Sequence, residues 1–374
     1  MVEIKEVESK RDKRLFATFP TDLYKDVPQA IPDIVLDEMD NFNPKKNPAY
    51  EYCDAKQFLA FKEGKCVGRI GAIISRAANE KWGTKRIRFT RVDFIDDIEV
   101  STALFKAVED WGRAEGLSEI HGPIGFCDMD QEGMLVDGFN TEGMFITIYN
   151  FPYYVTHMEK LGFIKDADWL EFRIYMPDII NEKLNKLSQT VLRKHKITLV
   201  EPKSRKEIKT YIRPVLDLLN TCYSELYGTV RLSDAQIKKY VNQFIMIINP
   251  EYVKLLLDQE GKLIGFGLAA PSMNKAVKKC NGRLFPFGWY RILRAPFQKA
   301  EVLDLYLVGV TPDMQNKGLT AVLMNSMTMT AAKNGIKHAE TGPELETNHQ
   351  VQALWKHYTT ENHKRRRCWI KPII

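Results

Sequence analysis

The chain repeats one pattern of hydrophobic and polar positions. Residues 57–68 form an apolar run, a short turn with glycine and a second apolar run that ends in Val-Gly. Residues 252–265 follow the same order and end in Ile-Gly. Each segment predicts a β-hairpin, because apolar runs of strand length flank a short turn. A pattern that recurs at such long spacing indicates two copies of one structural unit.

The residues after the two hairpins also correspond. An apolar strand is predicted at residues 87–94 in the first copy and at residues 302–310 in the second. Each strand precedes a run of helical periodicity, and the two runs end at Gly116 and Gly335. Glycine is the expected residue just past the end of a helix. The two copies therefore share the order hairpin, strand, helix.

A short strand and a Gly-Pro pair close each copy, but the copies differ in length. Gly68 and Gly122 are 54 residues apart, whereas Gly265 and Gly342 are 77 apart. The second copy therefore holds 23 additional residues, which we assign to the segment 275–299.

We predict two homologous α/β units that span residues 1–178 and 188–374, joined by the polar stretch 178–196. The composition, 44% hydrophobic and 27% charged, is typical of a folded protein. No stretch approaches the roughly 18 apolar residues of a membrane span, and the first residues lack a secretion signal. The six cysteines form no C-x-x-C pair, so we expect reduced thiols, no zinc site and a cytoplasmic protein.

The predicted strand 302–310 of the second unit leads into a turn with the run Val308-Gly309-Val310-Thr311-Pro312-Asp313-Met314-Gln315-Asn316-Lys317-Gly318-Leu319-Thr320. This run is similar to the acyl-CoA signature of GNAT acyltransferases. Gln315 and Gly318 match that signature, and Thr320 stands where Gly or Ala is usual. With its two copies, the whole chain resembles the long bacterial tandem-GNAT proteins. The resemblance implies two tandem GNAT-like domains with mixed α/β sheets, the second of which binds acetyl-CoA or a related acyl-CoA.

Such a turn suits a cofactor that carries a pyrophosphate. Backbone N–H groups at the start of a helix donate hydrogen bonds, and the helix dipole adds positive potential. Gly318 lets a phosphate approach because it has no Cβ, and Lys317 adds a cation. The alternative is an ordinary tight turn. The resemblance implies that the cofactor contacts Val308, Val310, Gln315, Asn316, Lys317, Gly318, Leu319, Thr320 and Asn348.

The first unit has acidic residues at the equivalent turn. Asp96, Asp97 and Glu99 replace the glycine, and their charges would repel a pyrophosphate. We predict that this unit kept the fold, lost the cofactor and serves as structural support or as one wall of the acceptor pocket.

Alternation along residues 301–308 places Leu303, Leu305 and Leu307 on one face and Asp304 and Tyr306 on the other. Some histone-acetylating members of the GNAT family carry a glutamate base near the position that Asp304 holds here. Burial in an apolar strand would raise the pKa of the Asp304 carboxyl toward the value that a base needs. The alternative is an aspartate paired with a Lys, Arg or His of a neighbouring strand.

GNAT enzymes usually place a tyrosine, the acid that protonates the departing thiolate, at the position held here by Trp355. Tyr358 lies about one helical turn away and could substitute, although an aromatic at that spacing also suits a core. The four histidines of residues 338–363 show no ligand spacing, so we expect no metal.

Two further segments keep two interpretations each. The basic run 363–367 predicts either a charged edge strand or an arginine fork for an anionic group of the acceptor. The inserted aromatic residues, Phe285, Phe287, Trp289 and Tyr290, either close the acceptor pocket or pack a helix at 290–297 on the other unit.

We therefore expect an acyl-CoA-dependent N-acyltransferase, most simply an N-acetyltransferase, with the amine acceptor bound between the units. Its catalytic candidates are Asp304, Tyr306 and Tyr358. The alternative is a non-catalytic sensor of an acyl-CoA or an anionic metabolite. We expect a small-molecule or peptide amine as partner, neither nucleic acid nor membrane, and a monomer that imitates a dimer or a homodimer.

Overall fold

The computed structural model describes residues 1–177 and 182–374, and the hairpins, strands and helices predicted for both copies are present. The first half contains β1 (Val2–Glu6), α1 (Lys10–Leu23), α2 (Val35–Asn41), β2 (Cys53–Lys62), β3 (Lys65–Ser75), α3 (Arg76–Trp82), β4 (Arg86–Phe94), α4 (Ile98–Ala114), β5 (Glu119–Gly122), β6 (Met134–Asp137), α5 (Tyr153–Lys160) and β7 (Ile164–Tyr175). The second half contains α6 (Glu182–His195), β8 (Thr198–Val200), α7 (Arg205–Cys222), α8 (Asp234–Phe244), β9 (Val253–Leu257), β10 (Leu263–Pro271), α9 (Asn274–Cys280), α10 (Gly288–Arg294), β11 (Val302–Val310), α11 (Leu319–Lys333), β12 (His338–Thr341), β13 (Glu344–Leu345), α12 (His349–Gln352) and β14 (Thr360–Pro372).

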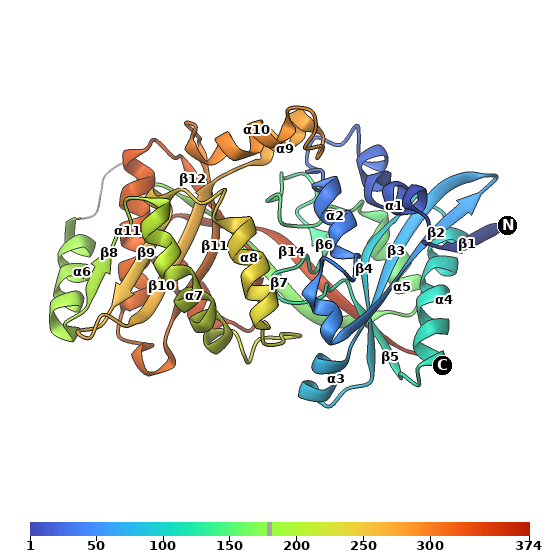
Figure 1. Cartoon of the computed structure of the whole chain (residues 1–374), viewed down its shortest axis with the longest axis horizontal. Coiled ribbons are helices and arrows are strands. Elements are labelled where there is room, and N and C mark those ends of the chain that lie inside the picture. The colour runs from blue at the N-terminus through green and yellow to red at the C-terminus, as the bar shows by residue number, and fades with distance from the viewer. Residues whose placement is uncertain (178–181) are drawn as a thin grey trace.

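The two halves share one continuous sheet. Its order is β1-β2-β3-β4-β5-β14-β7-β12-β11-β10-β9-β8, and the pairs β4–β5 and β11–β12 are parallel. The halves exchange their last long strands: β14 pairs with β5 of the first half, and β7 pairs with β12 of the second. β14 and β7 also pair with each other at the centre of the sheet, so backbone hydrogen bonds join the halves (Figure 1).

Helices cover both faces of the sheet (Figure 1). In the first half, Leu104 and Phe105 of α4 pack on Ile70, whereas Phe16 of α1 packs on Ile73 at the opposite face. In the second half, α11 and α6 cover one face, and α7 and α8 cover the other. The resulting mixed α/β architecture is the one that the repeat predicted.

The polar stretch predicted to join the units contains an ordered helix. Residues 178–181 lie outside the described part of the chain, and Glu182–His195 forms α6. Leu192 of α6 is buried against Leu319 and Val322 of α11, so this segment is a packed layer rather than an extended connection. No helix of the described residues combines the length and the apolar composition needed to cross a membrane.

The basic run 363–367 lies in the central strand β14, which corrects both interpretations of it. Arg366 is only 1% exposed and forms an ion pair with Glu171 of β7. Arg365 and Arg367 both bind Asp168, at 2.9 Å and 2.8 Å. The carboxylates of β7 thus neutralise these arginines inside the protein, and the run forms neither an edge strand nor a free anion fork.

We expect Arg366→Leu to lower the free energy of unfolding by about 3–5 kcal/mol, because it leaves the buried Glu171 carboxylate without its partner. Adding Glu171→Leu to this variant should recover much of the loss. Lys106→Ala, which breaks the exposed pair Lys106–Asp110, should cost less than about 1 kcal/mol. Urea denaturation measures all three, and a loss of similar size for Arg366→Leu and Lys106→Ala would contradict this account of the centre of the sheet.

Candidate active site

β11 is paired on its β12 side only at its beginning. The parallel register joins Val302–Leu305 to residues 338–341, and there β12 ends. β13 then pairs with β7, so, among the described residues, residues 306–310 of β11 have no strand partner on that side. On this edge the Val308 carbonyl accepts a hydrogen bond from the Tyr223 hydroxyl at 3.0 Å. A strand edge without a neighbouring strand can bind a ligand through its remaining N–H and C=O groups.

A β-bulge at Tyr306 changes which side chains of β11 share a face. Ala269 of β10 pairs with Leu305 and Leu268 pairs with Leu307, which leaves Tyr306 without a partner. Leu305 packs on the α11 side, but Leu307 packs with the cluster under α7 and α8. The predicted common face for Leu303, Leu305 and Leu307 is therefore wrong, because the extra residue reverses the alternation after it.

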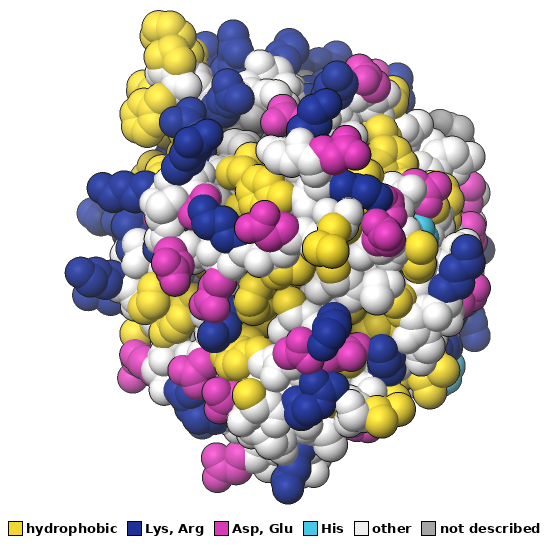
Figure 2. Space-filling view, turned by 90° about the vertical axis from the view of Figure 1, so that its right-hand side faces the viewer, with side chains coloured by type: hydrophobic (Ala, Val, Ile, Leu, Met, Phe, Trp, Pro, Cys, Tyr) yellow, Lys and Arg dark blue, Asp and Glu magenta, His cyan; other side chains and the backbone are white. Residues whose placement is uncertain are grey.

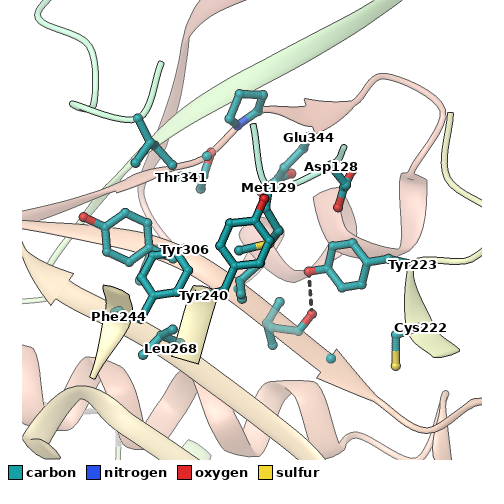
Figure 3. A pocket seen from close by; sticks show the side chains of 18 of the residues that line it. Asp128, Met129, Cys222, Tyr223, Tyr240, Phe244, Leu268, Tyr306, Thr341 and Glu344 are labelled. Carbon is teal, nitrogen blue, oxygen red and sulfur yellow. Dashed lines mark hydrogen bonds between the residues drawn. The ribbon is translucent and has the colours of Figure 1, made fainter. Parts of the chain in front are cut away.

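A cavity of about 1650 Å³ lies along this edge. Most of its lining is apolar and comes from β10, β11, α7, α8, α10 and α11, and loops of the first half complete the wall. Figure 3 shows the aromatic side chains of Tyr223, Tyr240, Phe244 and Tyr306 around the space, with Asp128 nearby. The volume exceeds the roughly 300–1,000 Å³ of an ordinary small-molecule pocket.

The turn before α11 forms a cluster of free amides. Asn316 and Gly318 have φ angles of 60° and 78°, and α11 begins at Leu319. Within residues 1–177 and 182–374, the backbone N–H groups of Asn316, Lys317 and Gly318 donate no hydrogen bond. Left-handed residues beside a helix N-terminus form the type of nest that binds anions. The site thus has the donors that a pyrophosphate needs.

The structure brings most of the predicted cofactor residues to the cavity wall. These are Val308, Val310, Gln315, Asn316, Gly318, Thr320 and Asn348. Leu319 is different, because its side chain is 1% exposed and belongs to the core. Lys317 is exposed beside the turn, and its Nζ lies 3.2 Å from the Met314 sulfur.

Asp304 lies behind the cavity wall rather than in it. Its side chain is buried, and burial raises the pKa of this carboxyl to about 7, helped by the nearby charges of Glu340 and Glu142. Tyr306 does line the cavity, and its hydroxyl lies 3.5 Å from Asp304 Oδ2. Within the described ranges, Asp304 forms none of the ion pairs that the alternative interpretation required.

Glu344 belongs to the candidate site but is not among the residues predicted from the sequence. It lines the cavity, and burial raises the pKa of its carboxyl to about 8. Trp355 Nε1 donates to both carboxylate oxygens, at 3.0 Å and 3.1 Å. The tryptophan in the usual tyrosine position therefore holds an acid in place. A signal was present in the sequence, because the first copy has Ile124 where the second has Glu344 after the Gly-Pro pair.

Tyr358 does not line the cavity. It packs with the core cluster that includes Trp355 and Met327, and its hydroxyl contacts Thr328 of α11. Burial raises the pKa of this phenol. This placement favours a core role for Tyr358 over the role of a general acid.

The equivalent turn of the first half is closed by its own side chains. Asp97 caps α4, and its carboxylate accepts from the Glu99 amide at 2.9 Å. Lys62 binds both Asp97 and Glu99. A carboxylate therefore already occupies the helix N-terminus that a phosphate would need.

One set of possible metal ligands lies beside the cavity, whose lining includes one of them, Asp166. Ligand atoms of His121, Asp166 and Cys368 lie within 4.8 Å of one another. The Tyr227 hydroxyl contacts all three, at 3.1 Å from His121 Nδ1 and 3.4 Å from the Cys368 sulfur. A protein hydroxyl thus fills the space between them, which explains the grouping without an ion.

The order of elements, the interrupted edge of β11 and the amide nest define an acyltransferase-type fold present in two copies. Residues 212–358 match the model of the Acetyltransferase (GNAT) family. A solved structure described as a tandem GNAT protein from the clavulanic acid biosynthesis pathway superposes with a TM-score of 0.57 at 12% identity, covering 100% of this chain and 99% of that one. Residues 212–358 are thus similar to the GNAT family, and the whole chain has the fold of a tandem GNAT protein.

Two relatives match along nearly the whole sequence. Protein YghO of Escherichia coli is 28% identical over 371 residues, which cover 98% of this chain and 94% of the relative. A protein named bacterial ceramide synthase, from Caulobacter vibrioides, is 24% identical over 98% of this chain and 96% of its own length. Both relatives therefore share the two-copy length.

The buried Asp304 predicts a pH-dependent stability. The folded state keeps this carboxyl protonated up to about pH 7, whereas the unfolded chain ionises it near pH 4. The unfolded state thus binds fewer protons in this window, so Asp304 destabilises the fold progressively as pH rises from about 4 to about 7. Asp304→Asn removes that effect. Its stability advantage over the wild type should grow by up to about 4 kcal/mol across the window and then level off.

Urea denaturation at pH 4.5, 6 and 8 measures this difference. Asp313→Asn, at an exposed aspartate in the next turn, is the control and should show no comparable trend. An Asp304→Asn advantage that stays constant or shrinks with rising pH would contradict the assignment of a buried, neutral carboxyl.

Proposed function

We propose that the protein transfers an acyl group from an acyl-CoA to the amine of an amphiphilic acceptor. The observation that carries this proposal is one continuous cavity. It runs from the amide nest at residues 316–318, along residues 306–310 of β11, to the carboxyl of Glu344. Donor site, reaction path and acid–base group thus share one space.

The donor would lie with its pyrophosphate on the nest and its chain along residues 306–310. Gly318 supports this role, because its φ of 78° suits a glycine at the turn and it belongs to the cavity lining. The cavity wall at Val308 and Val310 is apolar and suits a long acyl chain or a pantetheine arm. Acetyl-CoA is the simplest donor of this kind.

Glu344 would receive a proton from the ammonium form of the acceptor. The freed nitrogen attacks the thioester carbonyl carbon, a C–N bond forms, and the C–S bond breaks. The second proton of the nitrogen leaves with the thiol. A carboxyl with a pKa of about 8 is suited to this exchange near neutral pH, because it takes up and releases protons there.

The cavity is large, apolar and acidic at one end, which supports an amphiphilic acceptor. The first half contributes Asp128 and Glu132, whose carboxyl pKa values are raised by burial, to the wall near Tyr223. Such acids would bind an ammonium or hydroxyl headgroup, while the aromatic wall would hold a hydrocarbon chain. The relative named bacterial ceramide synthase supports a long-chain amino alcohol as acceptor.

In this proposal the first half, residues 1–178, binds no cofactor and supplies part of the acceptor wall, while the nest belongs to residues 188–374. The closed turn at Asp97 supports this division. Two halves in one sheet support a monomer that imitates a dimer. Six free cysteines support a reducing, cytoplasmic compartment.

An acyl-transfer assay tests the proposal. Purified protein is incubated with acetyl-CoA or palmitoyl-CoA and with an amine panel that includes sphinganine, lysine and a short peptide, and amide and free thiol are both quantified. We expect the amide of the long-chain amino alcohol. Tight acyl-CoA binding without turnover on any amine would favour the sensor alternative, which the displaced tyrosine position suggested.

Gly318→Ala should weaken acyl-CoA binding by about tenfold or more, because a side chain at positive φ distorts the nest. Gly335→Ala is the matched control: its φ of 74° is nearly the same, it lies at the other end of α11, and nothing lies within 4 Å of its Cβ position. Isothermal titration of both variants with CoA separates loss of the nest from general backbone strain. Equal weakening in both would contradict the site.

Glu344→Gln should lower kcat/KM by about a hundredfold at pH 8 and should remove most of its pH dependence. In the wild type, kcat/KM should rise from pH 6 to about 8 as this carboxyl ionises, and then level off. Glu346→Gln is the control, because that neighbouring carboxylate is already paired with Arg365 at 3.1 Å. A wild-type profile that falls through this range would contradict a base at Glu344.

A further inference from the structure

The inserted segment 275–299 carries the whole charge imbalance of the protein. It contains seven Lys and Arg and no Asp or Glu. The rest of the chain has 47 Lys and Arg against 48 Asp and Glu, so the net charge of +6 arises in these residues. A concentrated positive charge marks a surface that meets an anionic partner.

The same segment exposes large aromatic side chains. Phe285 is 76% exposed and Phe287 is 69% exposed, and Trp289, Tyr290 and Phe297 are each exposed by nearly half. We call this surface the aromatic-basic face: the five aromatics with the exposed basic residues Lys275, Lys279, Arg283, Arg291, Arg294 and Lys299. It lies over α9 and α10 at the top of the molecule (Figure 1), where Figure 2 shows hydrophobic side chains projecting beside Lys and Arg.

The face is held in a fixed position by both halves. Val277 and Ile292, on its inner side, are buried with Ile34 and Phe145 of the first half. Asn274 Nδ2 donates to the Gly143 carbonyl at 2.8 Å. The aromatics are therefore presented outward by a packed element.

The inner side of the same element lines the cavity. Leu284, Ile292 and Leu293 are part of the cavity wall, and Trp289 belongs both to that wall and to the exposed face. Trp289 therefore connects the exposed aromatics with the apolar lining of the cavity.

We propose that the aromatic-basic face docks on an anionic lipid bilayer and admits a lipid acceptor from it to the cavity. Aromatic side chains favour the boundary between headgroups and acyl chains, and Lys and Arg bind anionic headgroups. The face also contains a cation–π contact, in which the Arg294 guanidinium lies 5.4 Å from the centre of the Tyr290 ring. The inference extends the proposed function, because it names the source of the acceptor.

The earlier expectation of no membrane partner rested on the absence of a spanning segment. A protein that lies on a bilayer needs no such segment, only an apolar face with basic flanks. An acidic protein or a second copy of this chain would use hydrophobic contact and charge in a similar way. The bilayer is favoured because the element that carries the face also lines a mostly apolar cavity. A lipid could enter that cavity, whereas a docked protein would only cover the face.

Co-sedimentation with vesicles tests the face without any acyl-CoA. We expect the full chain to bind vesicles of phosphatidylcholine with 30% phosphatidylglycerol and to bind pure phosphatidylcholine about tenfold less well or worse. Phe285→Ser/Phe287→Ser should weaken binding to the anionic vesicles by about tenfold. Ile164→Ser/Leu187→Ser removes two hydrophobic side chains that are 65% and 59% exposed elsewhere, and should bind like the wild type.

Absence of binding to the anionic vesicles, or equal loss in both double variants, would overturn the proposal. Loss of a wild-type dimer in Phe285→Ser/Phe287→Ser, measured by light scattering, would overturn it in favour of a second copy. The proposed function is tested separately with an acceptor dispersed in detergent. If the protein binds vesicles but acylates no amine, only the proposed function fails; if it acylates the dispersed amine but binds no vesicle, only the docking face fails.

Discussion

Pairing of β7 with β14 is the interaction on which the rest of the molecule depends. Each half ends in a strand that completes the other half's sheet, so neither half can move away without breaking backbone hydrogen bonds in the middle of the sheet. The arginines of β14 and the acids of β7 are buried there as matched charges, and a register shift would leave them unpaired. This fixed geometry lets loops of the first half form a wall for a cavity of the second.

The two copies show how one fold can take two roles. After β11, left-handed residues at Asn316 and Gly318 leave amides free at the start of α11. After β4, Asp97 uses its carboxylate on the equivalent amides. The first copy has also filled its interior next to β4: the Tyr154 hydroxyl accepts from the Phe94 amide at 2.7 Å, and its ring stacks on Phe94. A ligand along that strand would have to displace an aromatic ring and an intramolecular cap.

Features that depend on neighbouring residues, such as hairpins and turns, could be predicted from the sequence. Features that depend on contacts between distant parts of the chain could not. Periodicity and glycine positions predicted the hairpins, the strand-to-helix turns and the repeated order. The motif predicted the nest, and the structure has the free amides there. Neither periodicity nor composition reveals that β14 is central, because a basic strand is ordinarily exposed and the acids that neutralise it lie nearly 200 residues away. The bulge at Tyr306 was also missed, because one extra residue leaves the apolar pattern of β11 looking regular.

Glu344 illustrates why chemistry is harder to predict than fold. A tryptophan in a usual tyrosine position suggests a lost function if each position is considered alone. In the structure, that indole binds a carboxyl which the cavity wall desolvates, so two departures from the expected pattern explain each other. The same reasoning applies to segment 275–299, where large exposed aromatic side chains would be unfavourable on a surface that meets only water. The buried Glu344 with its Trp355 partner and the exposed aromatics of segment 275–299 border the same apolar cavity. One amphiphilic ligand would therefore account for both.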